Sequence, residues 1–123
     1  MRGGIEVLFV PVRDPDRAKA FWVDRLGFRL DQDTVVGSGV RYVQVTPEGS
    51  ACSLAFGTDL SPMEPGTLRA AMLVVQDVET ARAELLEAGA EPTEIEEQPW
   101  GRFVYFADPD GNRFWLQELP GRS

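Results

Sequence analysis

The stretch F-A-D-P-D-G-N-R-F-W-L-Q-E, residues 106–118, decides how this chain folds. It joins the end of one apolar segment, a Pro-acid-Gly turn and the start of a second apolar segment, which is the pattern of a β-hairpin. A fainter copy, Q-V-T-P-E-G-S-A-C-S-L-A-F, occupies residues 44–56, with Pro47 aligned to Pro109. The repetition predicts that one structural unit occurs twice in the chain.

The repeat extends upstream of both hairpins. V-R-D at residues 12–14 matches V-Q-D at residues 75–77, and each aspartate is a favourable N-cap for a helix that a glycine then ends. Apolar segments with β-branched residues predict the strands. These strand candidates are residues 5–12, 28–36, 39–46, 50–57, 68–75, 90–97, 102–107 and 112–118.

The chain is therefore expected to be an α+β protein built from two βαβββ modules. We place the first module at residues 1–57, a Pro- and Gly-containing linker at 58–67 and the second module at 68–123. A period of this length with only two copies favours a single pseudo-twofold domain over a solenoid.

Composition excludes several classes of function. The 123 residues carry a net charge of −8 with no basic stripe, which argues against nucleic-acid binding. No apolar run approaches the length of a membrane-spanning helix, so no membrane association is expected. The single cysteine, Cys52, favours a reducing, cytoplasmic location. The absence of histidine removes the commonest general base and the commonest metal ligand.

The order of these motifs resembles the vicinal oxygen chelate superfamily, which includes glyoxalase I, fosfomycin-resistance enzymes, extradiol dioxygenases and bleomycin-resistance proteins. The resemblance covers nearly the whole chain and implies strands that curl into a cup, with helices packed outside. The matching motifs are V-R-D-P-D-R-A-K-A-F-W (12–22), L-G-F (26–28), V-Q-D (75–77), P-W-G (99–101) and D-P-D-G-N (108–112).

The resemblance also implies where metal-using members place their ligands. Those four positions are occupied here by Val7, Ser53, Ala70 and Trp115. Three of these side chains offer no coordinating atom, and a serine hydroxyl alone is a poor ligand for a divalent metal. We therefore predict no metal and no other cofactor.

Strand alternation sends every second side chain to the same face of a sheet, and this rule predicts the lining of the cup. Tyr105 occupies the place where extradiol dioxygenases carry a catalytic tyrosine, but no catalytic residue is assigned here. Trp115 either lines the cup or fills it as part of the core. The candidate ligand-binding residues are Val7, Phe9, Arg41, Ser53, Met72, Trp100, Phe103, Tyr105, Trp115 and Gln117.

An apolar, aromatic cup with a few polar groups is how small-molecule pockets are usually built. The first hypothesis is a metal-free binding protein that sequesters an aromatic or cationic compound such as an antibiotic. The alternative is an enzyme of the same family, an isomerase, cyclase or lyase, acting in the same cup. A third hypothesis is a member that acts through protein partners. We expect a homodimer, the commonest closed assembly, in which modules could be exchanged between chains.

Overall fold

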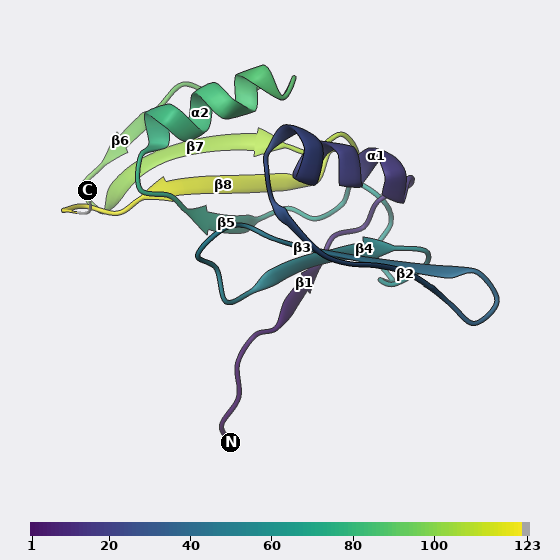
Figure 1. Ribbon diagram of the computed structural model, residues 1–123. Coiled ribbons are helices and arrows are strands. Elements are labelled where there is room, and N and C mark those ends of the chain that lie inside the picture. The colour runs from purple at the N-terminus through teal and green to yellow at the C-terminus, as the bar shows by residue number, and fades with distance from the viewer. Residues whose placement is uncertain (122–123) are drawn as a thin grey trace.

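A computed structural model describes residues 1–121, which form two four-stranded sheets with helices packed against them (Figure 1). The elements are β1 (Val7–Phe9), α1 (Pro15–Lys19), the π-helix η1 (Ala20–Arg25), β2 (Arg29–Val36), β3 (Val40–Thr46), β4 (Ser53–Gly57), β5 (Ala71–Val74), α2 (Val78–Glu87), β6 (Glu96–Gln98), β7 (Gly101–Ala107) and β8 (Arg113–Glu118).

The two sheets have the same topology. Their strand orders are β1-β4-β3-β2 and β5-β8-β7-β6, with β1–β4 and β5–β8 parallel and the remaining neighbours antiparallel. This arrangement confirms the predicted α+β class with a repeated βαβββ topology. The last two residues of the segment 68–123, Arg122 and Ser123, lie outside the described residues.

Each sheet has one face covered by a helix. In Figure 1, α1 lies above β3 and β4 and α2 lies above β7 and β8, in agreement with their contacts. We call this side the helix face and the opposite side of each sheet the free face. Within residues 1–121 no helix covers either free face, so the two free faces are where a ligand or partner could approach.

The N-caps form as expected. The Asp14 carboxylate accepts hydrogen bonds from the backbone N–H groups of Asp16 and Arg17, and Asp77 accepts from those of Glu79 and Thr80. The first helix differs from the second because it changes to a π-helix after five residues. Such a turn inserts an extra residue into the helix.

Several strands are shorter than the segments predicted for them, and β4 begins only at Ser53 of residues 50–57. Within residues 5–12 only β1 pairs as a strand, because Pro11 has no N–H to continue the ladder of hydrogen bonds. Residues 68–75 pair only over β5. The segment 90–97 contributes its end to β6, which continues one residue further to Gln98.

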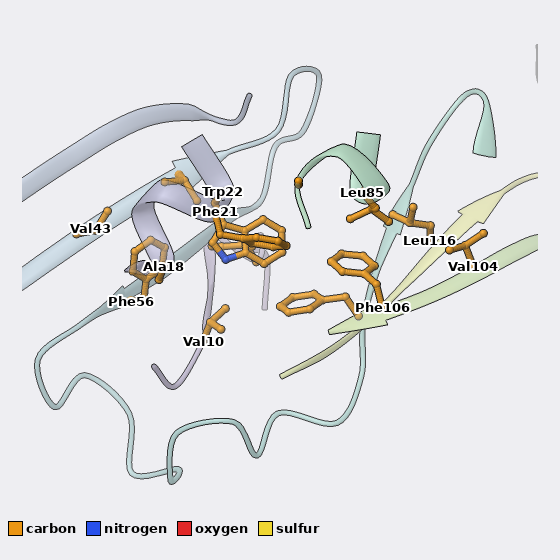
Figure 2. Close-up of a cluster of buried hydrophobic side chains, with 14 of the residues drawn as sticks. Val10, Ala18, Phe21, Trp22, Val43, Phe56, Leu85, Val104, Phe106 and Leu116 are labelled. Atoms are coloured by element: carbon orange, nitrogen blue, oxygen red, sulfur yellow. The ribbon is translucent and has the colours of Figure 1, made fainter. Parts of the chain in front are cut away.

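One aromatic cluster joins the two halves of the chain on the helix face. Trp22, from η1, is 0% exposed and its ring centroid lies 4.9 Å from that of Phe114 and 6.2 Å from that of Phe106. Figure 2 shows Phe21 and Trp22 between Val10, which follows β1, and Phe56 of β4 on one side and Phe106 of the second sheet on the other. The two sheets therefore share a single hydrophobic core.

The second hairpin turn makes contacts that the first turn does not. Asn112, which is 0% exposed, donates from Nδ2 to the Pro11 carbonyl at 2.8 Å and to the Asp108 carboxylate at 2.9 Å. Its Oδ1 accepts from the backbone N–H of Leu68 at 3.1 Å. One side chain thereby ties together the chain leaving β1, the chain entering β5 and the turn between β7 and β8.

Replacing this side chain should destabilise the fold. Asn112→Ala leaves the Leu68 N–H and one Asp108 oxygen without partners in a buried place, so we expect a loss of about 2–4 kcal/mol in the free energy of unfolding. Urea unfolding at fixed protein concentration measures this loss. Gln32→Ala, on the exposed part of β2, serves as the control and should change stability by less than about 0.5 kcal/mol. Equal losses in both variants would contradict the junction role of Asn112.

Candidate functional site

The free face of the second sheet is aromatic. The alternate residues of β7 and β8, Val104, Phe106, Phe114 and Leu116, are buried in the helix-face core. Strand alternation therefore places Phe103, Tyr105 and Trp115 on the free face, and Tyr105 is paired with Trp115 across the two strands. We call these three residues the aromatic face.

The three rings form a continuous surface. Phe103 and Tyr105 are nearly parallel, with ring centroids 6.4 Å apart and planes 7° apart. Tyr105 meets Trp115 edge to face, with a centroid distance of 5.4 Å. Trp115 is 39% exposed, and Met72, its neighbour on β5, is 53% exposed. In a single chain Trp115 therefore lies on an accessible surface and does not fill a closed core.

A polar contact borders the aromatic face. Gln117 is buried, and its Nε2 donates to the carbonyl oxygen of Trp100 at 2.9 Å. Gly101 follows with φ of 149°, and a Cβ there would lie 2.7 Å from the Glu118 carbonyl oxygen. The Pro-Trp-Gly segment is thus held against β8, with the Trp100 indole left exposed at the edge of the sheet.

The free face of the first sheet is mostly polar. Val7 and Ser53 are neighbours across β1 and β4, and Phe9 lies two residues further along the same face. The Ser53 hydroxyl is buried and lies 2.6 Å from the Thr46 hydroxyl, which also hydrogen-bonds to Asp31. The hydrogen bond from Thr46, followed by that from Arg29, lowers the pKa of Asp31.

Arg41 does not lie on the free face as expected. Its guanidinium points to the helix face, where it forms ion pairs with Asp33 at 3.0 Å and with Asp16 of α1 at 2.5 Å. Val43 lies two residues along β3 from Arg41, and so on the same face of the strand, and is buried in the helix-face core.

A difference in turn length explains why Arg41 lies on the helix face. The loop between β3 and β4 spans residues 47–52, whereas the loop between β7 and β8 spans residues 108–112 and is one residue shorter. A difference of one residue in the loop exchanges the two faces of the strand before it. The side-chain orientations of β7 therefore do not predict those of β3. The alternate residues Tyr42, Gln44 and Thr46 lie on the free face instead, and counting the two loops would have identified them.

The residues at the family's metal positions do not fit a metal ion. Val7 and Ser53 lie side by side, and the residue beside Trp115 on β5 is Met72, where the sequence comparison had indicated Ala70. This set offers one hydroxyl and one thioether, without the carboxylate or imidazole ligands that such sites need. Within residues 1–121 no group of three His, Cys, Asp or Glu side chains is arranged to hold an ion.

Comparison with known proteins identifies the family. The model of the Glyoxalase/Bleomycin resistance protein/Dioxygenase superfamily matches residues 4–116, so the chain belongs to that superfamily. No helix within residues 1–121 has the length and hydropathy to cross a membrane.

Similar proteins come from several bacteria. The structure of TnmS3, an antibiotic binding protein from Streptomyces sp. CB03234, has a TM-score of 0.87 and 38% identity, covering 96% of this chain and 97% of that chain. A glyoxalase/bleomycin resistance protein from the same strain has a TM-score of 0.83 and 39% identity, covering 94% of this chain and 100% of that chain. The protein YetH of Bacillus subtilis strain 168 is 29% identical in an alignment of 119 residues that covers 93% of this chain and 97% of YetH.

The ion pairs of Asp33 predict a pH dependence of stability. Hydrogen bonds from Arg41, then from Lys19, lower the pKa of Asp33 from 3.8 to about 2. Because the pKa is lower in the folded state, this stabilisation is fully present above pH of about 4 and disappears as the pH falls towards about 2.

Asp33→Asn should remove this part of the pH dependence. Its free energy of unfolding should fall less than that of the parent protein between pH 4 and pH 2, as measured by urea unfolding at several pH values. Asp24→Asn is the matched control, since Asp24 is exposed and forms no ion pair within residues 1–121. An acid profile of Asp33→Asn identical to that of the parent would rule out a stabilising role for the Arg41 contact.

Proposed function

We propose that this protein is a metal-free small-molecule binding protein that sequesters an aromatic or cationic compound, such as an antibiotic. The observation that carries the proposal is the aromatic face, where three neighbouring rings lie on one side of a sheet and those of Tyr105 and Trp115 remain accessible. Flat aromatic side chains stack on planar ligands, and such pairs contribute about 0.5–1.5 kcal/mol beyond the area they bury.

The similarity to TnmS3 supports this proposal. That protein is described as an antibiotic binding protein, and its identity of 38% extends over nearly the whole of both chains. The residues at the metal positions agree with binding that needs no metal, since they lack a set of ligands for one. Sequestration of an intact compound requires only a complementary surface, which the aromatic face supplies.

The chemistry of Tyr105 favours binding over proton transfer. Burial, and then the negative charge of Glu96, raise the pKa of the Tyr105 hydroxyl above its usual value of 10.0. At neutral pH the hydroxyl therefore keeps its proton and can donate a hydrogen bond to a ligand. A general base would need a pKa near the working pH, which is the opposite shift.

We also propose that a second copy of the chain completes the site. Pockets commonly bury about 70–90% of a ligand of this size, but one sheet face can cover only one side of it. Apolar side chains left exposed on the free faces include Phe9, Met72, Val74 and Trp115. A closed twofold dimer would place the free face of a partner over them and would explain why they are apolar.

Trp115→Ala tests the binding site. We expect its affinity for planar aromatic natural products to fall by about tenfold to several-hundredfold. Ligand fluorescence or calorimetry measures this affinity. Because Trp115 is partly exposed, the melting temperature of the Trp115→Ala variant should fall much less than that of Trp22→Ala. Removing the buried Trp22 indole leaves a cavity that costs about 3–5 kcal/mol of stability. Leu86→Ala, on the exposed side of α2, is the control that should bind normally.

The same experiment separates binding from catalysis. Compounds that bind should be recovered unchanged by mass spectrometry after incubation with the protein. Conversion of a bound compound into product would favour the enzyme alternative. Trp115→Ala with a collapsed melting temperature, together with a parent protein that binds no compound, would show that the aromatic face is structural and would overturn the proposal.

The oligomeric state provides an independent test. Light scattering should give a mass of about twice the 13.6 kDa of one chain. Val74→Asp places a charge on the free face and should shift the protein towards monomer, whereas Leu86→Asp, on α2, should leave the dimer intact. A parent protein that is monomeric at micromolar concentration would contradict the shared site.

A further inference from the structure

We infer that the aromatic face selects ligands that carry a cationic nitrogen group on or beside a planar ring system, and that Glu96 is the residue responsible for this selection. The inference rests on the proposed function, because it concerns the ligand of that same site. It adds a defined chemical class and a defined place for the charge.

The strand register places Glu96 beside the aromatic face. Glu96 is paired with Phe103 across β6 and β7, so both side chains lie on the same side of the sheet. Its neighbours in sequence point the other way: Ile95 packs against the core, and Glu97 accepts from Arg102 on the helix face. The carboxylate of Glu96 therefore projects from the free face.

The Glu96 carboxylate is also held in place. Gln98, two residues further along the same face, donates from Nε2 to Glu96 Oε1 at 2.6 Å. The strand register places Glu96 beside Phe103, one cross-strand row from Tyr105, and the negative charge of Glu96, after burial, raises the pKa of the Tyr105 hydroxyl. A negative charge thus lies at the solvent-exposed margin of the aromatic face.

This negative charge has no cationic partner in the described chain. Within residues 1–121 no lysine or arginine nitrogen lies within 4.0 Å of the Glu96 carboxylate. On the opposite side of the same sheet, by contrast, Arg102 pairs with Glu79, Glu97 and Glu118. The helix face is therefore balanced in charge around its arginine, whereas the aromatic face carries an unpaired carboxylate.

A carboxylate next to open aromatic rings is favourable for an organic cation. The carboxylate accepts charge-assisted hydrogen bonds from an ammonium or guanidinium group. The faces of Tyr and Trp attract a cation through their quadrupoles, with a contribution that increases as water is excluded. Arg113, the cation on this same face, is four residues from Gln117 along β8 and so lies about 13 Å away from the Glu96 row.

Cross-strand rows define the shape of the ligand. Glu96, Phe103, Gln117 and Val74 form one row across the sheet, and Tyr105, Trp115 and Met72 form the next row. Rows on one face are two residues apart, a separation of about 7 Å. A ligand with its rings over the Tyr105 row would thus reach Glu96 with an amine attached to or near the ring edge.

The charge of the first sheet agrees with this assignment. Burial, and then the negative charge of Glu6, raise the pKa of Tyr42, which lies on the free face of that sheet. On each free face, therefore, the charge of a carboxylate raises the pKa of a tyrosine. A site formed between two such faces would be negative, as is the whole chain with its net charge of −8.

Three planar probes of similar size test the inference. They are 9-aminoacridine, which is a cation at pH 7, acridone, which is neutral, and anthraquinone-2-sulfonate, which is an anion. The parent protein should bind 9-aminoacridine about tenfold more tightly than acridone at low salt and should bind the sulfonate most weakly. Fluorescence titration measures all three affinities.

Glu96→Gln isolates the charge. It should weaken the binding of 9-aminoacridine about 5- to 30-fold and change the binding of acridone by less than about twofold. Glu94→Gln is the matched control, because it changes the net charge equally at an exposed position on the preceding segment. Thermal melting of both variants checks that the fold is intact.

The outcomes separate the inference from the proposed function. Equal affinities for 9-aminoacridine and acridone, unchanged in Glu96→Gln, would overturn the inference while the aromatic binding site stands. Equal losses in Glu94→Gln and Glu96→Gln would also overturn it, since the effect would then come from net charge alone. Failure of all three probes to bind the parent protein would overturn the proposed function and the inference together.

Discussion

The buried side chain of Asn112 is the constraint on which the rest of the structure depends. Its hydrogen bonds to the Pro11 carbonyl, the Leu68 N–H and the Asp108 carboxylate join three segments that are far apart in the sequence. A buried amide with unmet hydrogen bonds is costly, so these segments have little freedom to separate. The Asp108 carboxylate shares this burial, which raises its pKa above the usual value.

This junction fixes where the two sheets lie and therefore what each face can do. With the chain held at Asn112, the η1 residues Phe21 and Trp22 pack against Phe106 and Phe114 and fill the space between the sheets. The helix faces of both sheets are buried in this shared core. The chemistry of the protein is consequently left to the free faces, where Tyr105 and Trp115 are accessible.

Most of the fold could be predicted from the sequence because its signals are local. The Asp14 and Asp77 caps and the Pro-acid-Gly turns act within a few residues, and they occur twice in the same order. The aromatic face also followed from the sequence, since β7 and β8 keep strict alternation around a short turn. The position of Glu96 beside Phe103 could not be predicted, because it depends on the pairing of β6 with β7, which the segment 90–97 shows only weakly.

The facing of Arg41 shows the limit of reasoning from an internal repeat. Two copies of a module can match in composition and still differ by one residue in a turn, and this difference exchanges the faces of the preceding strand.

The unequal hairpin loops have an evolutionary consequence. If the two modules descend from a duplicated ancestor, a single-codon insertion or deletion in one turn was enough to replace the whole lining contributed by a strand. Residues that once faced inward in one copy would face outward in the other, without any substitution along the strand itself. A duplicated scaffold can thus acquire two chemically distinct walls, one rich in hydroxyl and amide groups and one rich in rings, in one genetic step. Two chemically different sheet faces suit an asymmetric ligand better than two identical faces.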